Sequence, residues 1–395
     1  METHNNVDTR KSVVSALRTG TRVLTSDGIV NIEELQNKFF EIRNITGKWS
    51  RARCQKSDDD ALLYKITLTN GKEYFSTPEH IWPVLITKID AESEDTKDTK
   101  TQQKTVMRIP TRELKAKNML PYVKSDSLYS SHNAIGTYTD GFCLGMLHTC
   151  STDFITDSSI AGENYIWAVP QEWVDTGLDK ILTTWMSGID YSPIRAIDKE
   201  DDKKNKFRIY TTQSIVFSKY MDTFGISSID NVKNKTFGVP KAVWTGSEDF
   251  RAGFIDGIYS MCGGINEHHI LGYIPSASET FVRDICDLLG FYGIASTVRV
   301  EEKSTGGENM LPLILFEADL FSQMFHITHK KRQNLLDDVE HKNQNSIGEI
   351  EVASCVPTTL KDTMYSIIVY DSSHMFALSH CLTGNCENRI KKNIN

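Results

Sequence analysis

The stretch that decides the fold combines a predicted strand with a reactive dipeptide. It reads Tyr365-Ser366-Ile367-Ile368-Val369, then His374-Met375-Phe376-Ala377-Leu378, and then Gly384-Asn385-Cys386. The β-branched run predicts a strand. The side-chain amide of Asn385 is placed to attack its own carbonyl carbon, and the thiol of Cys386 can accept an acyl group. The two residues are the chemical minimum for cutting a chain and rejoining its flanks.

Two further motifs precede this stretch in the chain. The first runs Ala16-Leu17-Arg18-Thr19-Gly20-Thr21-Arg22-Val23-Leu24-Thr25-Ser26-Asp27-Gly28, and the second is Thr77-Pro78-Glu79-His80. An isolated Asn-Cys pair is most simply a surface turn. Three motifs in this order favour the reactive interpretation.

Composition places the chain among soluble globular proteins. It has 395 residues, of which 39% are hydrophobic and 24% charged, enough for two or three domains. The first 15 residues are polar, and no apolar run approaches the ~20 residues of a membrane helix. The eight cysteines are scattered without metal-ligand spacing. We therefore expect no membrane segment, no metal and no cofactor.

Charge is concentrated in the middle of the chain. Residues 136–330 contain 16 Lys and Arg against 26 Asp and Glu, a net charge of -10, whereas the rest contains 28 against 26, a net charge of +2. A protein that neutralises several phosphates needs clustered Lys and Arg. This region is therefore expected to bind DNA weakly or not at all.

The spacing of apolar residues along the chain predicts a β unit, an α/β insert and a second β segment. Strands are expected at residues 21–25 before the turn Ser26-Asp27-Gly28, and on both sides of the Asn70-Gly71 hairpin turn. Residues 90–104 are predicted to form a polar loop. The α/β texture begins near residue 136. Insertions of this kind are tolerated where the two ends of the host domain lie close together.

Within the insert, a helix is predicted over residues 278–289 with a stop at Gly290, followed by a strand at 295–300. Residues 199–206 are predicted to form a loop that separates the two halves of the insert. Residues 330–349 are predicted to be a hydrophilic linker, after which β texture resumes at 350–382.

The three motifs together resemble the Hint domain of inteins, the self-splicing elements. The resemblance implies a fold in which both chain ends form one all-β, horseshoe-like Hint splicing domain. Its parts would be residues 16–124 and 346–385, with 1–15 and 386–395 as flanking exteins. Residues 16–385 would excise themselves in a single autocatalytic turnover and ligate the flanks. The only partners implied are these flanking segments, the chain is expected to be a monomer, and the host protein would set a cytoplasmic or nuclear location.

The resemblance also assigns roles to single residues. Thr77 and His80 match the family's TxxH pair, in which His80 distorts the upstream junction peptide and protonates its leaving amine. His374 would assist succinimide formation by Asn385, and Cys386 would be the acyl acceptor.

Two departures from the family pattern affect the expected rate. Ala16 stands where the first nucleophile, usually Cys, is found, so the N-to-S acyl shift is impossible. We interpret Ala16 as a disarming substitution; the alternative is an intein that begins with Ala and uses direct attack by Cys386. Gly384 replaces the penultimate His, which predicts slower cyclisation of Asn385. Ser366 stands where Asp is common, and Ser15 is a further candidate nucleophile one residue out of register.

The insert contains two segments that resemble the paired LAGLIDADG helices of homing endonucleases, so residues 136–330 are expected to be an α/β domain with a pseudo-twofold repeat. They are Phe142-Cys143-Leu144-Gly145-Met146-Leu147-His148-Thr149-Cys150-Ser151 and Phe250-Arg251-Ala252-Gly253-Phe254-Ile255-Asp256-Gly257-Ile258-Tyr259. Aligned in this way, the family's metal-binding acidic positions hold Cys150 and Ile258. Neither is an oxygen ligand for Mg²⁺, so the resemblance implies a degenerate, catalytically dead nuclease.

Two alternatives remain open at this point. One is an active, site-specific LAGLIDADG DNA endonuclease whose splicing halves are scaffold. The other is a hedgehog-type Hint autoprocessing domain, against which the Asn385-Cys386 junction and the insert both count.

Overall fold

The computed structural model describes residues 15–88, 103–124, 135–149, 165–200, 204–225, 238–276, 278–299, 312–341 and 347–384. The chain divides into two compact units. The β unit consists of Met1–Lys124 and Ser346–Asn395, and the α/β unit consists of Ser125–Asn345. Segments from both ends of the sequence therefore build one body.

The described part of the β unit consists of strands and two short 3-10 turns. Its strands are β1 Leu17–Arg18, β2 Arg22–Thr25, β3 Gly28–Asn31, β4 Phe39–Arg43, β5 Trp49–Leu68, β6 Glu73–Ser76, β7 Ile81–Lys88, β8 Gln103–Pro110, β9 Met119–Val123, β17 Ile347–Val369, β18 Met375–Ala377 and β19 Leu382–Gly384. The turns are η1 Ile32–Leu35 and η2 Thr111–Glu113.

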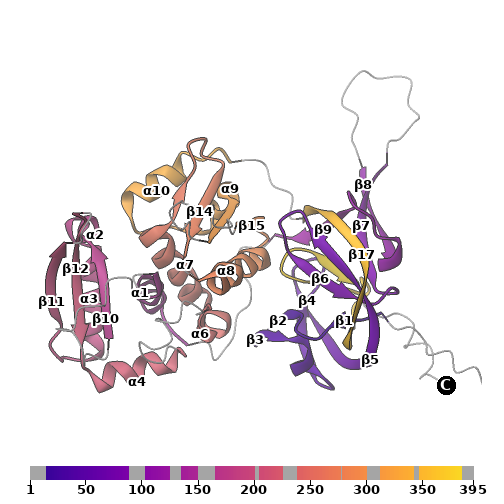
Figure 1. Cartoon of the computed structure of the whole chain (residues 1–395), viewed down its shortest axis with the longest axis horizontal. Helices are drawn as coiled ribbons and strands as arrows, with labels where there is room; N and C mark the ends of the chain where they lie inside the picture. Colours follow the sequence, from indigo (N-terminus) through magenta and orange to yellow (C-terminus); the bar gives the residue numbers. More distant parts are fainter. Residues whose placement is uncertain are drawn as a thin grey trace, which may run out of the picture. The chain divides into compact units, whose positions relative to one another are not determined.

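Strand β17, from the second segment of the β unit, pairs with strands from the first segment. Ten strands form a sheet in the order β3-β2-β4-β5-β6-β1-β17-β9-β7-β8, and β17 also pairs with β5. In Figure 1 the yellow β17 lies among the indigo and purple strands of the opposite chain end. Its antiparallel partners are β5, β1 and β9. The sheet is consequently incomplete without both segments.

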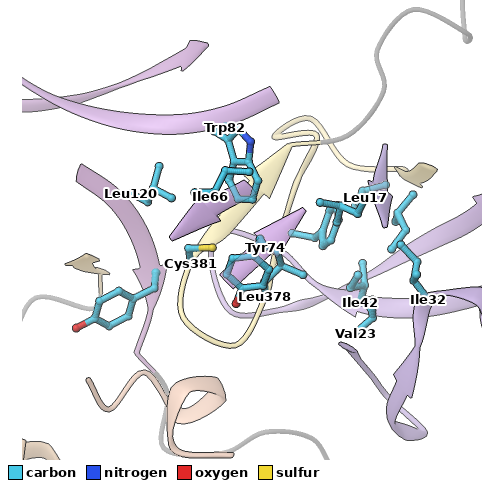
Figure 2. Packing of buried hydrophobic residues seen from close by; sticks show 14 of the residues in the cluster. Leu17, Val23, Ile32, Ile42, Ile66, Tyr74, Trp82, Leu120, Leu378 and Cys381 are labelled. Atoms are coloured by element: carbon cyan, nitrogen blue, oxygen red, sulfur yellow. The ribbon is translucent and has the colours of Figure 1, made fainter. Parts of the chain in front are cut away.

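The core of the β unit is one cluster of apolar side chains from both segments. Figure 2 shows Leu17, Ile66 and Trp82 from the early segment packed with Leu378 and Cys381 from the late segment. Trp82 and Cys381 are completely buried. Burial of this kind, at roughly 25 cal/mol per Å² of apolar surface, is the main stabilising term and holds the two ends together.

Both predicted turns of the β unit are confirmed. Gly71 has φ +81°, and β5 and β6 pair on either side of it. Gly28 has φ +111° and pairs with Thr25 across the β2–β3 turn. Only glycine adopts such angles without strain, which is why these dipeptides mark hairpins. Most of the predicted 90–104 loop lies outside the described residues, and its last two residues belong to β8.

The α/β unit contains helices and two antiparallel sheets, which confirms the α/β texture predicted for this region. Its elements are α1 Tyr138–Thr149, β10 Tyr165–Pro170, α2 Gln171–Thr176, α3 Leu178–Ile189, β11 Arg195–Glu200, β12 Lys206–Thr212, α4 Ile215–Thr223, α6 Lys241–Thr245, α7 Glu248–Cys262, β13 Gly264–Ile265, β14 Leu271–Pro275, α8 Glu279–Tyr292, β15 Ser296–Arg299, β16 Leu313–Glu317, α9 Ala318–Met324 and α10 Lys330–Asp337. The sheets run β10-β12-β11 and β13-β14-β16-β15.

Three sequence predictions for this unit need correction. Residues 199–206 were predicted to be a loop that separates two halves, but Lys199 and Glu200 belong to β11 and pair with Phe207 and Lys206 of β12. The predicted linker at 330–349 begins with α10, which buries Leu336 and leaves Leu335 exposed among polar residues. Helix α8 passes through Gly290 and ends at Gly293, which has φ +82° and so provides the left-handed cap.

Helices α1 and α7 approach each other more closely than side chains would allow. A Cβ built on Gly145 would lie 2.3 Å from the carbonyl oxygen of Phe254, and one on Gly257 would lie 2.2 Å from that of Phe142. Gly141 and Gly253 make the equivalent contacts one turn earlier. Glycines that make equivalent contacts in the two helices are 112 residues apart (253 − 141 and 257 − 145). The alignment of the two motifs in the sequence pairs residues 108 apart (250 − 142), so the structure shifts that alignment by four residues. By this relation Ile258 corresponds to Met146, one helical turn from Cys150.

Candidate functional site

Strand β1 places the predicted upstream junction, the peptide between Ser15 and Ala16, in the middle of the sheet of the β unit. Leu17 pairs with Ser76 of β6 on one side and with Tyr365 of β17 on the other. The preceding residues Ser15 and Ala16 are therefore buried, with 8% and 1% of their surface exposed. The Ser15–Ala16 peptide is held by strands from both chain ends.

Thr77 clamps the peptide on the Ala16 side. The amide of Ala16 donates to Thr77 Oγ1 at 3.0 Å, and the amide of Thr77 donates to the carbonyl oxygen of Ala16 at 3.0 Å. The structure thus brings Ala16 and Thr77 together. Their reciprocal hydrogen bonds fix the orientation of the peptide plane.

His80 contacts one hydroxyl group from each end of the chain. Its Nδ1 lies 3.0 Å from Ser15 Oγ, and its Nε2 lies 2.6 Å from Thr383 Oγ1. Thr111 holds the His80 backbone, because its amide donates to the His80 carbonyl at 2.8 Å. The ring of Trp82 packs edge-on against the imidazole of His80, with the two ring centroids 5.2 Å apart. These contacts fix the imidazole between residues that are far apart in sequence.

Burial counts against the acid role that the resemblance assigns to His80. Only 3% of its surface is exposed. Burial penalises the charged imidazolium and lowers the pKa of His80 to about 3. At neutral pH this residue is a neutral hydrogen-bonding group, which argues against its serving as a pre-protonated acid.

Ser366 contacts the carbonyl of the upstream junction directly. Its hydroxyl donates to the carbonyl oxygen of Ser15 at 2.6 Å, and 4% of its surface is exposed. A donor aimed at this oxygen can stabilise the negative charge that develops there during attack on the carbonyl carbon. The sequence marked Ser366 only as a departure from Asp, without this contact.

Gly384 occupies a position that has no room for a side chain. A Cβ there would lie 2.9 Å from the carbonyl oxygen of Ile81 and 3.1 Å from the Ile81 side chain. Gly384 ends β19, which pairs with β18, and Thr383 beside it reaches His80. The close approach of the two backbones accounts for glycine at this position.

The remaining predicted residues of the β unit are placed in part. His374 lies in the turn before β18 with φ +50°, and its amide donates to Asp371 Oδ1 at 3.1 Å. Asn385 and Cys386 lie outside the described residues. Cys381 is completely buried, and burial raises the pKa of its thiol well above the usual range. Cys381 is therefore a core residue and a poor nucleophile.

The methyl group of Ala16 lies in an apolar pocket. It packs with Leu63 and Met364, which are 1% and 0% exposed, and with the half-buried Phe75. A thiol in this pocket would be desolvated, so its pKa would be raised.

Helix α7 of the α/β unit carries a completely buried carboxylate, Asp256. Asp256 accepts hydrogen bonds from the Tyr138 hydroxyl at 2.8 Å, the Ser260 hydroxyl at 2.7 Å, and both the amide and hydroxyl of Thr328 at 2.9 and 2.6 Å. It is 0% exposed, and burial raises its pKa. These hydrogen bonds occupy both carboxylate oxygens and hold the loop at Thr328 against α7.

The positions aligned with catalytic acids offer no metal ligand where they are described. Ile258 is completely buried beside Gly145 of α1, and Cys150 lies outside the described residues. Arg332 donates to the carbonyls of Tyr259 and Met261 at the end of α7. Over the residues that the structure describes, no three His, Cys, Asp or Glu side chains are grouped to hold a metal ion.

No helix in the described ranges has the length and apolar character needed to cross a membrane.

Comparisons with known proteins returned solved structures alone. No protein-family model and no curated protein matches the chain. Similar structures include a variant of the homing endonuclease I-DmoI in complex with its target DNA, at 10% identity and a TM-score of 0.33, covering 50% of this chain and 97% of that one.

Two further structures are similar. The homing endonuclease I-WcaI bound to its DNA recognition sequence has 12% identity and a TM-score of 0.32, covering 51% of this chain and 88% of that one. Full-length DUF199/WhiA from Thermatoga maritima has 11% identity and a TM-score of 0.32, covering 54% and 65%. Because these TM-scores are low, the interpretation below rests on contacts within this chain.

Proposed function

We propose that the chain is a self-splicing intein precursor, impaired at its first step, that excises residues 16–385 and joins residues 1–15 to 386–395. The observation that carries this proposal is the meeting of Ser15 and Thr383 at the imidazole of His80. The first flanks the upstream junction, and the second stands two residues before the downstream dipeptide. Bringing such groups together supplies much of the rate enhancement in reactions of this kind.

The chemistry at the upstream junction follows from the groups around the Ser15 carbonyl. The sulfur of a thiol forms a bond to the carbonyl carbon, the carbon–nitrogen bond to Ala16 breaks, and the leaving amine takes the proton that the thiol loses. Ser366 stabilises the oxyanion. With a methyl group at residue 16, the sulfur has to come from Cys386, which is why the first step is impaired.

The downstream step uses the side chain of Asn385. Its amide nitrogen bonds to its own carbonyl carbon, and the bond to the nitrogen of Cys386 breaks. The proton that the amide loses balances the proton that the new amine gains. The product is a succinimide at residue 385 and a free amino terminus at residue 386.

Replacing Ala16 by Cys tests the proposal. We expect mass spectrometry of A16C to detect a released species of residues 16–385, formed slowly at pH 7 and faster at pH 8.5, because the apolar pocket disfavours the thiolate. The matched control A16S carries a much weaker nucleophile and should react more slowly. Upstream cleavage without ligation would favour hedgehog-type autoprocessing instead.

The unmodified chain discriminates between two routes. We expect it to stay mostly intact, with slow cleavage after Asn385. Recovery of residues 1–15 joined to 386–395 would show that Cys386 attacks the Ser15 carbonyl directly. In N385A both downstream cleavage and ligation should disappear.

For the α/β unit we propose a degenerate LAGLIDADG-type domain without nuclease activity. The glycine-mediated packing of α1 and α7 supports the helix pair. Ile258 and Met146 offer no oxygen ligands, and Asp256 is already fully hydrogen-bonded. Incubation with plasmid DNA and Mg²⁺ should give no specific double-strand cuts, and such cuts would overturn this assignment.

A further inference from the structure

The outer face of strands β4 and β5 carries two exposed aromatic rings and two arginine side chains. Phe39 in β4 is 53% exposed, and Tyr370, the residue after β17, is 52% exposed. Their ring centroids lie 6.2 Å apart, with the ring planes inclined at 32°. The guanidinium carbons of Arg51 and Arg53 in β5 lie 4.4 and 5.4 Å from the centroid of the Phe39 ring. We refer to these four residues as the Phe39 patch.

The pairing register of β4 and β5 explains why these side chains gather on one face. Phe39 pairs with Arg53, and Glu41 pairs with Arg51. Alternate residues of a strand point to the same face of a sheet, so both arginines lie beside Phe39. Ala52, between them, points to the opposite face and is completely buried. The aromatic rings therefore lie away from the core, where a cluster of exposed apolar groups marks an interaction site.

The two arginines of the patch have no anionic partner among the residues that the structure describes. Within those ranges neither Arg51 nor Arg53 forms an ion pair or a side-chain hydrogen bond, and the Nε atom of Arg53 is buried without a hydrogen-bond partner. Each guanidinium group instead lies over the ring of Phe39. The patch thus combines two unpaired positive charges with aromatic surface, and its charge is complementary to an anionic ligand.

A single nucleic-acid strand matches both properties of the patch. Its bases have open faces that stack on aromatic rings and on guanidinium planes, and its phosphates accept hydrogen bonds from arginine. A duplex hides its base faces within the stack, and an acidic peptide would pair with the arginines without a planar group for each ring. We propose that the Phe39 patch binds single-stranded nucleic acid. Bases stack on Phe39 and Tyr370, and phosphate oxygens accept hydrogen bonds from the two guanidinium groups.

This binding activity is independent of the proposed splicing function, because it uses none of the residues that act at the junctions. The test is fluorescence anisotropy of a labelled oligothymidylate of about 12 nucleotides, a length within the range bound by single-strand binding domains, titrated with the full chain. We expect binding at about 50 mM salt that weakens as the salt concentration rises. F39A/Y370A should weaken binding at least about 25-fold, because each stacked ring contributes about five-fold or more.

Arginine variants separate the charge of the patch from its planar groups. For a single strand, each phosphate contact contributes about 0.7 to the slope of the logarithm of the binding constant against the logarithm of the salt concentration. R51Q/R53Q should therefore reduce that slope by about 1.4 (2 × 0.7). R51K/R53K keeps both charges but loses the planar groups, so it should bind more weakly than the parent with the same slope.

Matched controls come from exposed residues of the α/β unit. Tyr191 is 96% exposed, and Arg299 is also exposed, so Y191A and R299Q remove the same kinds of group elsewhere. Both controls should bind within about two-fold of the parent, since neither residue belongs to the patch.

Three results would overturn the proposal. The first is no change in anisotropy up to about 100 μM protein, the weak end of non-specific binding. The second is a loss of affinity in Y191A or R299Q as large as in the patch variants. The third is displacement of the oligonucleotide by an equal charge of poly-glutamate, with F39A/Y370A binding as well as the parent. That result would show a surface that recognises negative charge alone.

Discussion

Adding one methyl group at Gly145 should push helices α1 and α7 apart. The new Cβ in G145A would lie 2.3 Å from the carbonyl oxygen of Phe254 and 3.1 Å from the amide nitrogen of Ile258. Both are backbone atoms of a helix and cannot rotate away. Ordinary contact begins near 3.4 Å, so the helices must separate by about 1.1 Å (3.4 − 2.3) at this point.

The cost of that separation is estimated from overpacked cores. Forcing extra methyl groups into a tightly packed site costs about 1–3 kcal/mol. The same helices lose dispersion contacts over their buried interface when they move apart. Converted at 1.36 kcal/mol per factor of ten, the penalty predicts amide exchange about five- to 150-fold faster in α1 and α7.

Hydrogen exchange measured by mass spectrometry is the suitable assay, because it reports on each helix separately in a chain of two units. G188A is the matched control. Gly188 lies in α3, is exposed, and has no atom within 4 Å of a built Cβ. Alanine there should slow exchange in α3 by up to about five-fold, because it is up to about 1 kcal/mol better than glycine inside a helix. If G145A exchanges no faster than G188A, the close approach of α1 and α7 is refuted.

Three further predictions follow from buried polar groups and close contacts. Since burial lowers the pKa of His80 to about 3, its contribution to the free energy of unfolding is complete above pH 6.5 and is lost as pH falls. At pH 5 the urea unfolding of the β unit should lose about 2 kcal/mol through His80, and H80Q should remove that share, whereas His148, whose pKa burial lowers to about 4, affects the α/β unit. G384A places a Cβ 2.9 Å from the Ile81 carbonyl and should lower the unfolding midpoint of the β unit. D256N places an amide NH2 group against hydroxyl donors and should lower the free energy of unfolding in urea by about 2 kcal/mol or more. D249N, in the first turn of α7, should lower the free energy of unfolding by less.

Local structure was predictable where a single residue determines the backbone. Gly28 and Gly71 both have positive φ and form the hairpin turns expected from their dipeptides. The end of α8 was missed by three residues because Gly290 tolerates a helical backbone, while the left-handed cap falls on Gly293. Helix α10 was missed because only Leu336 is buried on it, too little apolar surface to produce a periodic pattern.

The register of α1 against α7 was not predictable from the motif. Both Gly141 and Gly145 fit a small-residue position, so the sequence alone admits alignments that differ by one turn. Only the backbone contacts of Gly253 and Gly257 distinguish them. The choice of partner is a tertiary property, because both alignments bury the same face of each helix.

The candidate site was predictable only through its family resemblance. The Thr77-to-His80 motif was expected to lie at the peptide before Ala16, and the hydrogen bonds of Thr77 with Ala16 place it there. Thr383 was missed, since a hydroxyl residue two positions before the reactive dipeptide has no local signature. The neutral state of His80 was also missed, because burial within a sheet assembled from distant segments cannot be read from a short motif.

The position of β17 in the sheet determines the earliest time at which the proposed cleavage can occur. A ribosome completes Met1–Lys124 well before it reaches Ile347, yet β1 and β9 need β17 between them. During that interval β1 and β9 lack the strand that pairs with both of them. The intervening α/β unit has its own core and can fold by itself. The topology of the sheet therefore means that the proposed cleavage cannot begin before the last strands have been synthesised.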